Sequence, residues 1–185
     1  MNKKTRVVVN AGVLGAMYIA LSFAQNLIWP TSTTFAIQFR LAEVLNIFAF
    51  YTPAAVPGLS IGCLCYNLLY AESLPLDFLA GTLATALATL CMYRLRRLRW
   101  KHIPWLGLCM PAVFNGPLVG WELTAFLAPE GFTLPVFGVN VLLVAVGETA
   151  VMLTCGLVLY RTMERSRLAE RLFGAAASGR GQKRC

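Results

Sequence analysis

Long apolar stretches follow one another along most of this chain, separated by short polar segments. A helix needs roughly 20 apolar residues to cross about 30 Å of hydrocarbon, and six stretches reach or approach that length. Pro53 and Pro57 interrupt the second and third stretches, because proline disrupts helix interiors. The predicted fold is an all-α integral membrane bundle of six transmembrane helices, at about residues 7–28, 37–52, 54–71, 75–93, 103–128 and 134–160.

Basic residues mark the ends of these stretches. Of the 16 Lys and Arg residues, 15 fall into three clusters: residues 3–6, residues 94–101 and residues 161–184. Cytoplasmic loops are enriched in Lys and Arg, so all three clusters are expected in the cytoplasm, which requires an even number of spans between them. Four spans and then two satisfy this condition. The net charge of +8 therefore reflects topology and attraction to anionic lipid, and it requires no nucleic acid partner.

The 185 residues predict one membrane domain over 1–173 and a basic, disordered cytoplasmic tail over 174–185. Residues 29–38 are rich in Thr and predict a lid-like outer loop. The Gly-x-x-x-x-Gly-Lys-Ser/Thr phosphate loop, the Gly-x-Ser-x-Gly elbow and the His-Glu-x-x-His motif are all missing. The six cysteines and His102 lack metal-ligand spacing, so no metal site and no catalytic residues are expected.

Asp77, at the start of the fourth stretch, is assigned to an outer loop, and four formal charges lie deeper within the proposed spans: Arg40, Glu43, Glu122 and Glu148. Insertion scales put a central charged residue at about +2.5 to +3.5 kcal/mol, so such groups face a partner or a wet cavity. Arg40 and Glu43 are three residues apart, which allows an ion pair on one helix face. The alternative is that one of them contacts a ligand.

Residue counts give the depth of the other two charges. Glu122 and Asn115 are seven residues apart, so they share a helix face about 10 Å from each other. The sixth span runs antiparallel to the fifth, and counting from the outer ends places Glu122 at the level of Asn140 and Asn115 at the level of Glu148. These levels predict a polar cleft that opens toward the outside.

Carboxyl and amide groups of this kind suit a planar heterocycle with an N–H edge, and Trp121, Phe126 and Phe137 are candidates for a stacking wall. Alternatively, each Glu hydrogen-bonds its Asn and only holds the bundle together. Gly116, Pro117 and Gly120 are expected to loosen the helix, which membranes tolerate where the backbone lines a cavity.

Small residues recur every four positions in the first span, at Gly12, Ala16, Ala20 and Ala24. Such a stripe lets another helix approach closely, which is a main source of association in lipid. Packing inside the bundle and docking of another subunit are both consistent with this pattern.

Three stretches resemble the QueT family: IQFRLAEVL at 37–45, YTPAAVPGLSIG at 51–62 and PLDFLAGTLAT at 75–85. This family contains the substrate-binding (S) components of energy-coupling factor (ECF) transporters that are assigned to queuosine precursors. The resemblance implies a multi-pass protein of the bacterial cell membrane that captures a 7-deazaguanine such as queuine or 7-aminomethyl-7-deazaguanine. The ligand is expected between the later helices, where the Asn/Glu cleft falls.

The resemblance also implies partners: a transmembrane coupling (T) subunit and two ATPase (A) subunits, which bind the ATP and Mg²⁺. S components dock the T subunit through an Ala-x-x-x-Ala stripe on the first helix, which Ala16 and Ala20 match. Three alternatives stay open: an S component for another vitamin or nucleobase, a stand-alone proton-coupled carrier, and a small membrane enzyme with Glu122 or Glu148 as proton shuttle.

Overall fold

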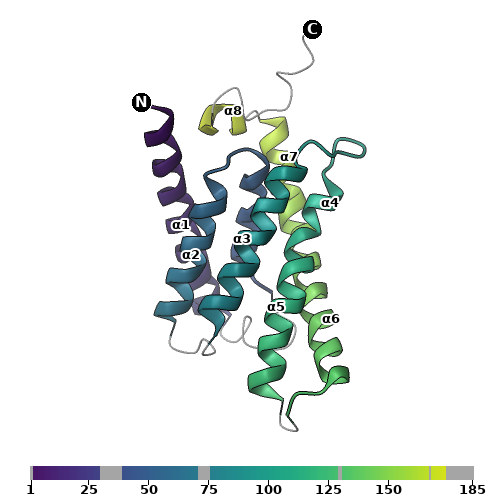
Figure 1. Ribbon diagram of the computed structural model, residues 1–185. Helices are drawn as coiled ribbons and strands as arrows, with labels where there is room; N and C mark the ends of the chain where they lie inside the picture. The colour runs from purple at the N-terminus through teal and green to yellow at the C-terminus, as the bar shows by residue number, and fades with distance from the viewer. Residues whose placement is uncertain (1, 30–38, 71–75, 129–130, 167, 174–185) are drawn as a thin grey trace.

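The computed structural model describes residues 2–29, 39–70, 76–128, 131–166 and 168–173, and within them the chain is helical apart from short turns and one isolated β-bridge. The order of elements (Figure 1) is α1 (Lys3–Ile28), η1 (Leu41–Phe50), α2 (Ala55–Leu69), α3 (Asp77–Leu95), α4 (Trp105–Leu108), α5 (Met110–Leu127), α6 (Leu134–Val151), η2 (Met152–Gly156), α7 (Leu157–Arg165) and α8 (Leu168–Phe173). The predicted tail, and the predicted lid loop apart from Trp29, lie outside the described residues.

Five of the six predicted helical stretches agree with these bounds to within a few residues. The second, predicted over 37–52, is different: η1 is a 3₁₀ helix of 10 residues, eight of them buried. At about 2 Å per residue it spans roughly 20 Å, so it is shorter than a membrane-crossing helix. Pro53 follows closely and disfavours helical backbone before it, which is consistent with an early end. The sixth stretch contains a π-helical segment, η2, that periodicity does not reveal.

Three helical segments in the described ranges are long and apolar enough to cross a membrane: Lys4–Ile28, Asp77–Leu95 and Leu134–Arg165. Large apolar side chains cover their outer faces, for example Val8, Leu27, Leu79 and Leu142. Soluble proteins rarely expose so much apolar surface, so the outer faces of these helices fit lipid.

Glycines bring α1 and α2 into close contact. A Cβ atom added at Gly58 would lie 2.5 Å from the Ala11 carbonyl oxygen, and one at Gly62 would lie 2.7 Å from that of Gly15. Small residues allow helix backbones to approach this closely. The face of α1 that packs inside the bundle is therefore the one with Ala11 and Gly15.

Glycines also join α5 to α6. A Cβ atom at Gly120 would lie 2.9 Å from the Val141 backbone nitrogen, and one at Gly116 would lie 3.3 Å from the Val141 carbonyl oxygen. α5 continues without a break from Met110 to Leu127, although Pro117 inside it has no backbone N–H to donate. The glycines serve as packing points.

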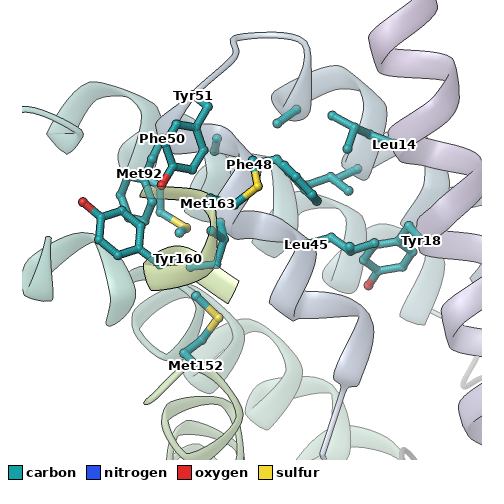
Figure 2. Close-up of a cluster of buried hydrophobic side chains, with 14 of the residues drawn as sticks. Leu14, Tyr18, Leu45, Phe48, Phe50, Tyr51, Met92, Met152, Tyr160 and Met163 are labelled. Atoms are coloured by element: carbon teal, nitrogen blue, oxygen red, sulfur yellow. The ribbon is translucent and has the colours of Figure 1, made fainter. Parts of the chain in front are cut away.

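The apolar core lies where η1 meets the ends of the longer helices (Figure 2). Tyr160 of α7 packs edge-on against Phe50, with ring centroids 5.8 Å apart, and stacks on Tyr51 at 6.2 Å. On the other side of η1, Tyr18 of α1 lies beside Leu45 in Figure 2. The short 3₁₀ helix therefore forms the centre of the bundle.

The described members of the three basic clusters gather at one end of the bundle. Arg6 donates to the Leu172 carbonyl oxygen at 3.3 Å, and Arg99 pairs with Glu164 at 3.5 Å. Figure 1 shows the start of α1, the end of α3 and α7 with α8 at this same end. This arrangement agrees with the charge pattern of the sequence and places Asp77 and the end of α5 at the opposite end.

Candidate functional site

An ion pair ties η1 to α3 at the end of the bundle opposite the basic clusters. The Arg40 guanidinium lies 3.2 Å from the Asp77 carboxyl oxygen, and both side chains are largely buried. The expected ion pair between Arg40 and Glu43 is not formed among the described residues, and the alternative, a ligand contact of one of them, stays a prediction. Arg40 directly precedes η1 in extended backbone, so the three-residue spacing of a regular helix does not apply to the two side chains.

Glu43 is fully buried in the middle of the bundle. Its carboxyl group meets three donor groups, the hydroxyls of Tyr18 at 2.8 Å and Thr85 at 3.2 Å and the amide of Asn46. Donors from α1, η1 and α3 thus converge on one carboxyl group. This network satisfies Glu43 internally and fixes its position.

Glu122 and Asn115 of α5 and Glu148 of α6 are fully buried as well. In contrast to Glu43, none of their side-chain nitrogen or oxygen atoms forms a hydrogen bond of regular geometry with the described residues, although Asp77 and the Leu76 backbone lie close to the Glu122 carboxyl group. A buried polar group without a partner costs about 1–3 kcal/mol, and more if it is charged. Six of the nine buried side-chain atoms without a partner among the described residues thus belong to these three residues, which makes them suited to receive a polar ligand.

The predicted register of α5 and α6 is confirmed. Gly120 lies against Val141, and the Asn140 amide donates to the Thr124 hydroxyl at 2.9 Å. This antiparallel pairing puts Glu122 at the level of Asn140 and Asn115 at the level of Glu148.

The alternative in which each Glu hydrogen-bonds the Asn at its own level is not what the structure shows. Asn140 bonds Thr124 instead of Glu122, and neither Asn115 nor Glu148 is hydrogen-bonded to the other. Glu122 is two residues beyond Gly120, roughly opposite the α6-facing side of α5. Asn140 therefore serves helix packing, whereas Glu122 turns toward α3.

Electrostatic contacts extend the cluster beyond α5 and α6. Asp77 and Arg40 act on the Glu122 carboxyl group, while Glu43 and Arg40 act on Glu148. The candidate site therefore lies among η1, α3, α5 and α6. Asp77 was missed in the sequence because it was read as an outer-loop residue; depth counting from Arg40 would have placed both at the same end.

The predicted aromatic wall is not formed in this structure. Trp121 and Phe126 lie on the exposed surface of α5, and Phe137 stacks on Phe132 with ring centroids 5.8 Å apart. Trp121 precedes Glu122 by one residue, so about 100° of helix rotation separates the two side chains. An aromatic group that the sequence did not single out lies at the end of α2, where Tyr66 and Tyr70 stack at 5.4 Å and Phe23 contacts Tyr66 edge-on.

The four-residue stripe on α1 faces outward. Gly12, Ala16, Ala20 and Ala24 are all exposed, and a Cβ atom added at Gly12 would meet nothing within 4 Å. Packing inside this bundle therefore does not explain the stripe. The internal packing role belongs to Ala11 and Gly15 on the neighbouring face.

An apolar outer surface around a buried, partly unsatisfied polar cluster fits the class of membrane transport proteins. A sequence model described as "QueT transporter" matches residues 8–165, which is most of the chain. The chain belongs to the QueT transporter family, the S-component family for queuosine precursors. Comparison with curated proteins and with solved structures gave no match.

Proposed function

We propose that this protein is the S component of an ECF-type transporter and that it captures a queuosine precursor in the polar cluster of α3, α5 and α6. The observation that carries the proposal is the set of six unpartnered side-chain atoms on Asn115, Glu122 and Glu148. A ligand rich in N–H groups satisfies such acceptors, whereas an apolar ligand leaves them unpaired.

The chemistry of a 7-deazaguanine matches these groups. Its N1–H and 2-amino group form a parallel pair of donors, which one carboxyl group accepts in a bidentate manner. Glu122 is assigned this role because it lies nearer the end opposite the basic clusters, which the positive-inside rule makes the outer end. Asn115, two turns deeper on the same face, offers both a donor and an acceptor to the rest of the ring.

The family also supports a topology and a set of partners. The proposed topology has six passes through the cell membrane, the shortest of them made by η1, and both termini in the cytoplasm. The common location of the described basic residues is consistent with it. The outward stripe of Gly12, Ala16, Ala20 and Ala24 is proposed to dock the T subunit, because small residues allow close approach of another helix. ATP and Mg²⁺ are then used by two partner A subunits.

Equilibrium binding to the purified protein tests the substrate. Queuine, 7-aminomethyl-7-deazaguanine and 7-cyano-7-deazaguanine are titrated against the detergent-solubilised chain, with guanine and an unrelated vitamin as controls. Saturable binding of at least one deazaguanine, in preference to the controls, supports the proposal. Failure of all three to bind contradicts it, and selective binding of the vitamin indicates an S component for another compound.

Reconstitution tests the coupling. The chain is placed in liposomes with and without a T subunit and two A subunits, and uptake of the bound deazaguanine is followed. Uptake that requires both the partners and ATP supports an ECF transporter. Uptake by the chain alone, driven by a proton gradient, identifies a stand-alone carrier instead.

A further inference from the structure

The buried cluster carries more acidic than basic groups. Glu43, Asp77, Glu122 and Glu148 supply four carboxyl groups from four different helical elements, and Arg40 is the single basic side chain in this cluster among the described residues. Arg40 is already bonded to Asp77. A buried carboxylate needs a cation or a proton to balance its charge. Further positive charge would therefore stabilise this cluster.

The excess is concentrated at the deeper level, around Glu148. Its two carboxyl oxygens have no partner among the described residues. The like charge of Glu43 acts on the group, and so does the opposite charge of Arg40, which is bonded to Asp77. Glu43 is held in place by Tyr18, Thr85 and Asn46, so it does not turn away from its neighbour. Asn115 lies at the same level, fully buried, and its amide oxygen is a further unpartnered acceptor.

We propose that Glu148 and the Asn115 amide oxygen, supported by the negative charge of Glu43, form an ammonium-binding subsite that selects the amine-bearing, cationic queuosine precursors over the neutral nitrile. This inference rests on the proposed function and deepens it. Two levels about 10 Å apart receive the two ends of one ligand: Glu122 accepts the ring edge, and Glu148 accepts the protonated amine. An ammonium group donates three hydrogen bonds and brings one positive charge, whereas a nitrile donates none.

Glu122 is less suited to the amine. Its neighbours Asp77 and Arg40 form an ion pair that is neutral as a unit, so the local excess is smaller than at Glu148. A neutral N–H edge is an adequate partner there, since it supplies donors without a full charge.

Paired titrations test the subsite. The dissociation constants of 7-aminomethyl-7-deazaguanine and 7-cyano-7-deazaguanine are measured on the wild type, Glu148→Gln, Glu122→Gln and the control Glu170→Gln in α8. The wild type and Glu170→Gln are expected to prefer the amine by about ten-fold or more, the range of a charge-assisted hydrogen bond. Glu148→Gln should bring the ratio close to one mainly by weakening the amine, whereas Glu122→Gln should weaken both ligands and leave the ratio unchanged.

The outcomes separate the two proposals. Equal affinity of the wild type for both compounds, or an unchanged preference in Glu148→Gln, overturns the ammonium subsite while the proposed function stands. Absence of binding by every deazaguanine overturns both. A melting curve for each variant in detergent identifies misfolding. If Glu148→Gln does not fold, Glu148→Asp takes its place, and its shorter side chain should reduce the preference for the amine without abolishing it. An undiminished preference in Glu148→Asp overturns the subsite.

Discussion

The Arg40 guanidinium lies 3.2 Å from the Asp77 carboxyl group and thereby ties the start of η1 to the first turn of α3. The pair is largely buried, and its charges act on Glu122, while that of Arg40 also acts on Glu148. It fixes a positive charge beside two carboxyl groups that have no hydrogen-bond partner among the described residues. The same ion pair therefore holds η1 and α3 together and sets the charge next to the candidate site.

Replacement of Asp77 by Asn should destabilise the protein, because Arg40 keeps its buried charge but loses its ion pair with Asp77. Breaking a buried pair costs about 3–5 kcal/mol, and the lower end is expected here since Glu122 and Glu148 remain near Arg40. Unfolding in detergent measures the change. The control is Glu164→Gln at the more exposed Arg99–Glu164 pair, where about 1 kcal/mol or less is expected. Equal losses in both variants would contradict a structural role specific to Arg40 and Asp77.

Substitution of Gly58 by Ala should force α1 and α2 apart, because the new Cβ atom would lie 2.5 Å from the Ala11 carbonyl oxygen. Overpacking of this kind costs about 1–3 kcal/mol, which thermal unfolding detects. Gly12→Ala is the matched control: its Cβ atom meets nothing within 4 Å, and alanine favours the helix. A tolerated Gly58→Ala would mean that the close contact is not present in the folded protein.

Substitutions of Asn140 and Asn115 should have opposite effects on stability and ligand affinity. Asn140→Leu removes the hydrogen bond to Thr124 and is expected to lower stability by about 1 kcal/mol with little change in ligand affinity. Asn115→Leu removes two unpartnered polar atoms from the centre of the bundle, so it should leave stability equal or higher and weaken binding about ten-fold or more. The reverse pattern would move the ligand to the interface of α5 and α6.

A bulky residue on the outward stripe should block transport without affecting capture. Ala20→Trp adds a large side chain to an exposed position, so ligand binding and the melting temperature should stay at wild-type values while ATP-dependent uptake is lost. Leu142→Trp on the exposed face of α6 is the control and should retain uptake. Loss of binding in Ala20→Trp would show that the stripe belongs to the internal packing.

Local patterns predicted much of this fold. Apolar length gave five helical stretches to within a few residues, and depth counting gave the levels of Glu122 with Asn140 and of Asn115 with Glu148. Both succeed because rise per residue is nearly constant in a regular helix. The same rule fails for η1, where a 3₁₀ helix changes both the rise and the facing of side chains, so the Arg40–Glu43 pair was wrong.

Contacts between distant segments were harder to predict. Residue counts fix the height of Glu122 but not its facing, and the packing of Gly120 on Val141 turns Glu122 toward α3. The same rotation places Trp121 on the outer surface, which removes it from the predicted stacking wall. Asp77 joins the site only because α3 begins beside Arg40, a tertiary relation that one sequence does not display.

The most direct test of the central claim is an experimental structure of the protein with a bound queuosine precursor. The predicted result is a deazaguanine ring whose N1–H and 2-amino group lie within hydrogen-bond distance, about 2.7–3.2 Å, of the Glu122 carboxyl group, with Asn115 and Glu148 in contact deeper in the bundle. A ligand held elsewhere, with Glu122 and Glu148 still unpartnered, would contradict the assignment of this polar cluster as the binding site.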